Sequence, residues 1–234
     1  MKTILSGLLI FSFLTFGLEG VQGLGPVRAE GESKKAGPVH FRWAFGALKK
    51  TGGDLHFVPI EKDTTLTTGD QLKIFMELRK TCFVYVLYRS SQGKMHVLFP
   101  SSLKQPEDSL KTKEHVYIPQ GEDYFQLDDQ VGLETFYLIA SAWRLTKLEK
   151  LVEGYGSAGP KDKDQLAAQI ISEIQHLRKK YRKLKASAER PVQIVGTIRG
   201  SDKKENTLRA KLSTIAVEVS ADDVYIRTFT IDHQ

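Results

Sequence analysis

The chain has 234 residues, of which 41% are hydrophobic and 26% are charged, and its formal net charge is +6 at pH 7. This composition excludes a disordered chain, a collagen-like repeat and a polytopic membrane protein, and leaves a globular protein of one or two domains. The single cysteine, Cys82, excludes an internal disulfide and a zinc site built from several thiolates. We therefore expect the fold to be held together by packing.

An apolar segment near the start of the sequence has the features of a secretory signal peptide. It covers residues 4–18, and its 15 residues fall short of the roughly 20 needed to span a bilayer. Small residues permit cleavage after Gly23 or after Ala29. We expect a signal peptide over residues 1–29, a flexible mature N-terminus over 30–38, and a periplasmic or secreted protein without a transmembrane segment. An uncleaved anchor is the alternative.

The sequence that follows has the pattern of a β-rich protein. Short runs of apolar, β-branched and aromatic residues are separated by glycine, proline and serine, as strands are separated by turns. The expected strands cover residues 40–48, 54–60, 72–78, 81–88, 95–99, 115–118, 124–127, 134–141, 192–198, 214–219 and 224–231. About ten short strands predict a mainly β fold, either a β-sandwich or an open barrel, with one short helix near residues 145–152 and one long helix.

The long helix carries most of the net charge. Apolar residues recur at three- and four-residue steps, which predicts an amphipathic helix from about residue 162 to 187. Between Lys161 and Arg190, nine basic residues against four acidic ones give a net charge of +5. The candidate interaction surface is its basic end, made of Arg178, Lys179, Lys180, Tyr181, Arg182, Lys183 and Lys185. We expect a protein or another anionic envelope partner there, and no nucleic acid. A solvated helix face is the alternative.

The expected elements combine into one domain. Residues 39–153 supply a β core that needs further strands, so we expect residues 191–234 to complete the same sandwich. Residues 154–190 then form an insertion, consisting of a glycine loop and the basic helix. Two units divided near Gly154 are the alternative.

No residue pattern indicates a catalytic, cofactor or metal site. The G-x-G-x-x-G at residues 154–159 follows helical spacing and lacks the preceding strand of a dinucleotide fingerprint, so we interpret it as a helix C-cap and a loop. We expect His56, His96 and His115 to be edge or core histidines, since a metal site needs several converging ligands. Cys82 is expected to be a buried, inert thiol. We therefore expect neither an enzyme nor a bound cofactor.

From Thr65 to Leu151, the order of short motifs resembles the bacterial domain-of-unknown-function family 4384 (DUF4384). The matching residues are Gly69, Asp70, Phe83, Val84, Tyr85, Val86, Gly93, Leu98, Phe99, Pro100, Ile118, Pro119, Gly132, Glu134, Ser141, Leu145 and Leu148. The sequence departs from the family at residues 111–114, where the pattern has a glycine. The resemblance implies a non-catalytic β domain, often joined to caspase-like peptidases or protein kinases, whose motif residues mark architecture and no ligand.

These observations predict an exported, non-catalytic β-domain protein that acts as a binding or interaction module in the bacterial cell envelope. The first alternative is a small-ligand or glycan-binding protein with an aromatic cleft, formed by Trp43, Tyr85, Tyr88 and Trp143. The second is an unrecognised hydrolase, for which the sequence offers no convergent polar groups.

Overall fold

The computed structural model describes residues 38–52, 54–104, 112–181, 188–191 and 204–234. All of them belong to one compact unit that spans residues 35–234. The expected signal peptide and the expected strand at residues 192–198 lie outside the described residues. No helix in the described ranges combines the length and the apolarity needed to cross a membrane.

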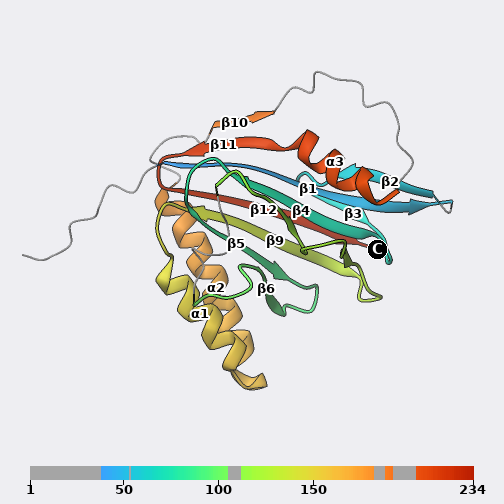
Figure 1. Cartoon of the computed structure of the whole chain (residues 1–234). Helices are drawn as coiled ribbons and strands as arrows, with labels where there is room; N and C mark the ends of the chain where they lie inside the picture. Colours follow the sequence, from blue (N-terminus) through green and yellow to red (C-terminus); the bar gives the residue numbers. More distant parts are fainter. Residues whose placement is uncertain (1–37, 53, 105–111, 182–187, 192–203) are drawn as a thin grey trace, which may run out of the picture. The chain divides into compact units, whose positions relative to one another are not determined.

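The described residues form two β-sheets and three helices (Figure 1). The first sheet has the strand order β10-β11-β1-β4-β7, with β2 paired to β1 and β8 paired to β4. The second sheet has the order β3-β12-β9-β5-β6. The fold is therefore mainly β, as predicted, and its two separate sheets make it a sandwich.

The strands are β1 (Val39–Thr51), β2 (Asp54–Pro59), β3 (Thr64–Leu66), β4 (Gln71–Leu78), β5 (Phe83–Arg89), β6 (Met95–Phe99), β7 (His115–Ile118), β8 (Phe125–Gln126), β9 (Gly132–Ser141), β10 (Ala188–Pro191), β11 (Val217–Ala221) and β12 (Val224–His233). The helices are α1 (Thr146–Ser157), α2 (Pro160–Tyr181) and α3 (Lys204–Ile215). Neighbouring strands pair antiparallel, except β3 and β12, which pair in parallel.

The main core lies between the two sheets and follows from the two-residue period of the strands. On β1, Trp43 and Phe45 are buried there together with the alternate residues on either side. The Phe45 ring centroid lies 5.0 Å from that of Phe136 on β9 and 5.4 Å from that of Phe229 on β12. These edge-to-face contacts between aromatic rings join the two sheets across the core.

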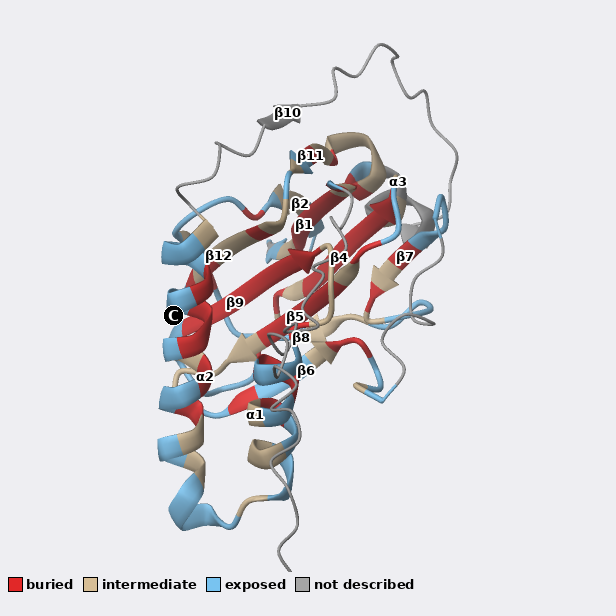
Figure 2. Cartoon of the chain, turned by 90° about the vertical axis from the view of Figure 1, so that its left-hand side faces the viewer, coloured by how far each residue is buried: buried red, intermediate tan, exposed pale blue. Residues whose placement is uncertain are grey.

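A second core lies between the outer face of the second sheet and the helices α1 and α2. The second sheet has a core on each side, so both faces of β5 are covered: Val86 faces the first sheet, whereas Leu87 packs against the helices. Ile170 and Ile174 of α2 are fully buried in this layer. Figure 2 shows buried residues over most of the sheet strands, and exposed residues along α2 beside its buried ones. The apolar run at residues 81–88 was correctly predicted to be a central strand, although β5 begins at Phe83.

The first sheet is covered on its outer face by α3, which the sequence did not predict. Leu212 of α3 packs there with Ala44 of β1 and Phe75 of β4. The predicted strand at residues 214–219 is wrong at its start, since α3 continues to Ile215 and β11 begins at Val217. The helix was missed because residues 204–215 are rich in polar residues and carry only a narrow apolar stripe.

The predicted glycine loop is also wrong at its start. Helix α1 continues through Gly154 and Gly156 to Ser157, and α2 begins at Pro160. A β-carbon on Gly154 would lie 3.9 Å from a methyl carbon of Leu166, an ordinary van der Waals distance, so α2 packs beside α1 at this position. Packing against a neighbour outweighs the low helix propensity of glycine. The expected helix end at residues 182–187 lies outside the described residues.

Candidate binding site

The basic end of α2 is an exposed helix end rather than a concave site. Arg178, Lys179 and Lys180 are exposed. Arg178 donates a hydrogen bond to the hydroxyl of Thr228 on β12. The Lys180 ammonium lies 5.1 Å from the centroid of the Tyr181 ring. The remaining residues of the predicted surface, Arg182, Lys183 and Lys185, lie outside the described residues.

The four aromatic residues of the alternative cleft do not converge. Trp43 is buried between the two sheets, whereas Tyr85 is buried between the second sheet and the helices. Tyr88 lines a small cavity at one end of the sandwich. Trp143 packs against Tyr181, with ring centroids 5.7 Å apart. An aromatic cleft made of these four residues is therefore absent from the fold.

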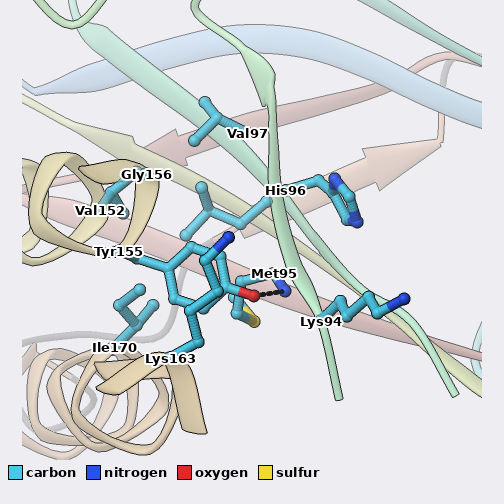
Figure 3. Close-up of a pocket in the computed structure, with 10 residues that line it drawn as sticks. Lys94, Met95, His96, Val97, Val152, Tyr155, Gly156, Lys163 and Ile170 are labelled. Atoms are coloured by element: carbon cyan, nitrogen blue, oxygen red, sulfur yellow. Dashed lines mark hydrogen bonds between the residues drawn. The ribbon is translucent and has the colours of Figure 1, made fainter. Parts of the chain in front are cut away.

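A cavity of about 390 Å³ lies between strand β6 and the hairpin of α1 and α2 (Figure 3). This volume is within the range of small-molecule sites. β6 is the edge strand of the second sheet, so one side of it is free of strand pairing and faces α1. The lining residues are Leu87, Lys94, Met95, His96, Val97, Val152, Tyr155, Gly156, Lys163 and Ile170.

The Tyr155 hydroxyl joins α1 to the edge strand. It accepts a hydrogen bond of 3.0 Å from the backbone N–H of Met95. The contact satisfies a donor that an edge strand would otherwise leave unpaired, and it holds the phenol ring in the cavity wall. Among the described residues, the hydroxyl's own proton has no acceptor. Tyr155 can therefore donate a hydrogen bond to a bound molecule.

Two lysines line the cavity, and one of them, Lys163, lies over the Tyr155 ring. The Lys163 ammonium lies 5.3 Å from the centroid of the Tyr155 ring, which is a cation–π contact. In Figure 3 the side chains of Lys94 and His96 point away from the Tyr155 ring. No acidic residue is among the lining residues, and Leu87, Met95, Val97, Val152 and Ile170 make the walls mostly apolar. This arrangement favours a ligand with an apolar body and an anionic or hydrogen-bond-accepting group.

The residues that could carry reaction chemistry do not gather at the cavity. Cys82 is buried, and burial raises the pKa of its thiol to about 12. Of the three histidines singled out in the sequence, His56 and His115 are exposed on β2 and β7, while His96 stacks on Tyr88 at 5.6 Å. Within the described ranges, no three His, Cys, Asp or Glu side chains are placed to hold a metal ion.

The Gly-Asp motif builds a turn. Gly69 has a φ of +89°, a backbone conformation that favours glycine. The buried Asp70 carboxylate accepts hydrogen bonds from the backbone N–H groups of Lys50, at 3.0 Å, and Thr67, at 2.9 Å, and from the Thr67 hydroxyl. The motif therefore joins the turn before β4 to the end of β1.

The departure from the DUF4384 pattern has a structural counterpart. Lys113 has a φ of +68°, the left-handed conformation in which glycine is the favoured residue. Its backbone N–H donates to the carbonyl of Leu78 at 2.8 Å. Within residues 111–114, Lys113 thus adopts a conformation that favours glycine, and β7 follows at His115 in pairing with β4.

Residues 65–143 match the family model of DUF4384, a domain of unknown function. The match covers about one third of the chain. No curated protein and no solved structure matches the chain. The DUF4384 segment contributes Leu87 and residues 94–97 to the cavity, and the helices that follow it contribute the other half.

Sequence reasoning missed Tyr155 and Lys163, the two polar groups that face the cavity. Tyr155 stands between the glycines that were interpreted as a loop, and Lys163 was counted only as part of the basic helix. The available signal was the helical spacing of Leu148, Val152 and Tyr155, which places Tyr155 on the face of α1 that covers the sheet.

Proposed function

We propose that this protein is an exported, non-catalytic binding module of the bacterial cell envelope that binds a small amphipathic anion between β6 and the hairpin of α1 and α2. The observation that supports the proposal is a mostly apolar cavity of ligand size in which the Lys163 ammonium lies over the Tyr155 ring and, within the described residues, the Tyr155 hydroxyl has a free proton to donate. Ligand sites in proteins have this composition: mostly apolar walls and a few polar groups that orient the ligand.

The class of ligand follows from the apolar and the charged lining residues of the cavity. Leu87, Met95, Val152 and Ile170 offer apolar contact, which favours an alkyl chain by about 25 cal/mol per Å² of buried surface. Lys163 offers a positive charge at the Tyr155 ring, and charge-assisted hydrogen bonds to a carboxylate are stronger than neutral ones. A medium-chain carboxylate has both groups: an alkyl chain for the apolar residues and an anionic group for Lys163.

Calorimetric titration of the purified protein with octanoate and with 1-octanol tests the proposal. We expect octanoate to bind, 1-octanol to bind more weakly, and Lys163→Met to remove most of the difference. Val152→Trp fills the cavity and should abolish binding of both. Lys161→Met, an exposed lysine on the same helix, is the matched control and should bind as the wild type does. Equal binding by wild type and Val152→Trp would refute the assignment of the cavity.

A second candidate contact is the basic end of α2. Three consecutive cations, Arg178, Lys179 and Lys180, stay exposed while the preceding Leu177 is buried, so their charges face solvent. Reversal of the three charges to Glu should weaken sedimentation with anionic lipid vesicles at low salt, and added salt should weaken the wild type in the same way. Salt-independent binding, or no loss in the variant, would exclude this surface.

Export is supported by the apolar segment at residues 4–18. Fractionation of cells that express a C-terminally tagged chain tests it, with N-terminal sequencing of the recovered protein. We expect the tag outside the cytoplasm and cleavage after Gly23 or Ala29. A full-length cytoplasmic product would overturn the localisation while leaving the ligand proposal open to its own test.

A further inference from the structure

A second cavity, of about 210 Å³, lies at one end of the sandwich and shares no lining residue with the first. It is enclosed by β4, β5, β6, β9 and the segment around β8. The lining residues are Leu72, Tyr88, Leu98, Phe125, Gln126, Leu127, Asp128, Glu134 and Phe136. All of them belong to the DUF4384 segment, and none is basic.

The polar centre of this cavity is the buried carboxylate of Glu134, which is only 2% exposed. One oxygen, Oε2, accepts a hydrogen bond of 2.6 Å from the Tyr88 hydroxyl. The other oxygen, Oε1, lies 3.9 Å from Nδ1 of His233, which is beyond hydrogen-bond distance. Oε1 therefore accepts no hydrogen bond from the described residues, and Glu134 lines the cavity, so this oxygen can accept one from a molecule bound there.

His233 stands behind Glu134 and does not supply that donor in its neutral form. Its Nε2 lies 3.1 Å from the Thr68 hydroxyl oxygen, and the Thr68 hydroxyl already donates its proton to the carbonyl of Asp128. In the neutral imidazole, Nε2 must therefore carry the hydrogen and Nδ1 is an acceptor. Nδ1 of the buried His233 has no hydrogen-bond partner among the described residues. In the neutral form, His233 therefore offers no proton to Oε1 of Glu134.

Aromatic rings frame the same carboxylate. Tyr88, Phe125 and Phe136 line the cavity, and the Tyr88 and Phe136 ring centroids are 4.9 Å apart. Aromatic faces attract cations, and alkyl groups gain from burial against Leu98 and the rings. We infer that this cavity binds a primary alkylammonium ion, whose N–H groups donate to Oε1 of Glu134 while its alkyl stem packs on the aromatic rings.

Titration of the purified full chain with n-butylammonium and with 1-butanol, followed by calorimetry or NMR, tests the inference. We expect n-butylammonium to bind at least tenfold more tightly than 1-butanol, because only the cation pairs with Glu134. Glu134→Gln keeps the shape of the side chain and should remove that preference. Glu153→Gln, at an exposed glutamate that lines neither cavity, is the matched control and should leave amine binding unchanged.

Leu98→Trp provides a second route if Glu134→Gln fails to fold. Leu98 is partly buried at the cavity, so tryptophan should fill the space without removing the carboxylate. Loss of amine binding in a folded Leu98→Trp protein supports the site. Three results would overturn it: no amine binding by the wild type, equal binding of amine and alcohol, or amine binding that survives the filling of the cavity.

Discussion

Replacement of Glu149 should weaken the packing of α1 on the second sheet and lower the free energy of unfolding. Its carboxylate is 4% exposed and accepts a 2.5 Å hydrogen bond from the Tyr85 hydroxyl. Arg144 donates to the same carboxylate at 2.6 Å through Nη2 and at 3.1 Å through Nε. Tyr85 belongs to the DUF4384 segment, while the two charged residues follow it. This network is therefore a buried polar link between the matched segment and the helices, in addition to the contact between Met95 and Tyr155.

The burial of this network sets how much unfolding free energy each substitution should cost. Glu149→Leu leaves the Tyr85 hydroxyl without an acceptor and Arg144 without its ion-pair partner. Removal of one member of a buried ion pair costs about 3–5 kcal/mol. Because the Arg144 side chain is 36% exposed and regains some hydration, we expect the lower end, about 3 kcal/mol. Tyr85→Phe should cost about 2 kcal/mol, since one charge-assisted bond is lost and the N–H of Leu145 loses its acceptor.

Urea denaturation of the single and double variants measures these values. Glu149→Leu and Tyr85→Phe remove the same hydrogen bond, so the double variant should cost about 1–2 kcal/mol less than the sum of the single variants. Glu153→Leu, an exposed glutamate one turn further along α1, is the matched control and should stay within about 0.5 kcal/mol of wild type. A loss below 1 kcal/mol for Glu149→Leu, or additive single costs, would refute the reasoning.

Three further predictions concern the DUF4384 segment. Asp70→Ala removes three hydrogen bonds from a buried turn and should cost about 2–3 kcal/mol of unfolding free energy in urea, and a cost near zero would contradict the role of the motif. Lys113→Gly should raise stability by about 0.5–1 kcal/mol in the same assay, while Lys113→Ala should not. Burial raises the pKa of the Cys82 thiol from 9.0 to about 12, so the unfolded chain ionises first as the pH rises. Between about pH 8 and pH 10 the wild type should lose about 1 kcal/mol relative to Cys82→Ala, and parallel pH profiles of the two proteins would contradict this.

The bounds of a strand were predictable where turn-forming residues stand directly before or after it. β6 and β7 were predicted with their observed bounds, because Gly93 and Pro100 flank the first and Pro119 ends the second. Gly93 has a φ of +82°, so the turn before β6 depends on glycine itself. Helix α3 was not predictable in the same way, because its position depends on the apolar surface around Phe75 that Leu212 covers.

The candidate site was harder to predict than the fold. The exposure of Arg178, Lys179 and Lys180 follows from the period of the helix and was expected. The cavity beside β6 depends on how far α1 continues past Gly154, which no local propensity indicates. The burial of Glu134 was equally hidden, since an isolated glutamate in a strand is expected to face solvent. Only the assembled sheets bring Tyr88 and His233 to it.

The place of β12 in the second sheet has a consequence for how the protein is made. This strand, residues 224–233, lies between β9 and β3 and pairs with both. During synthesis, β3 and the edge of β9 that does not pair with β5 stay unpaired until residues 224–233 have been made. Such long-range pairing slows folding, and in the meantime the unpaired backbone groups of these strand edges can pair with other chains and cause aggregation. The nascent protein therefore has a long interval in which a chaperone would protect it from aggregation.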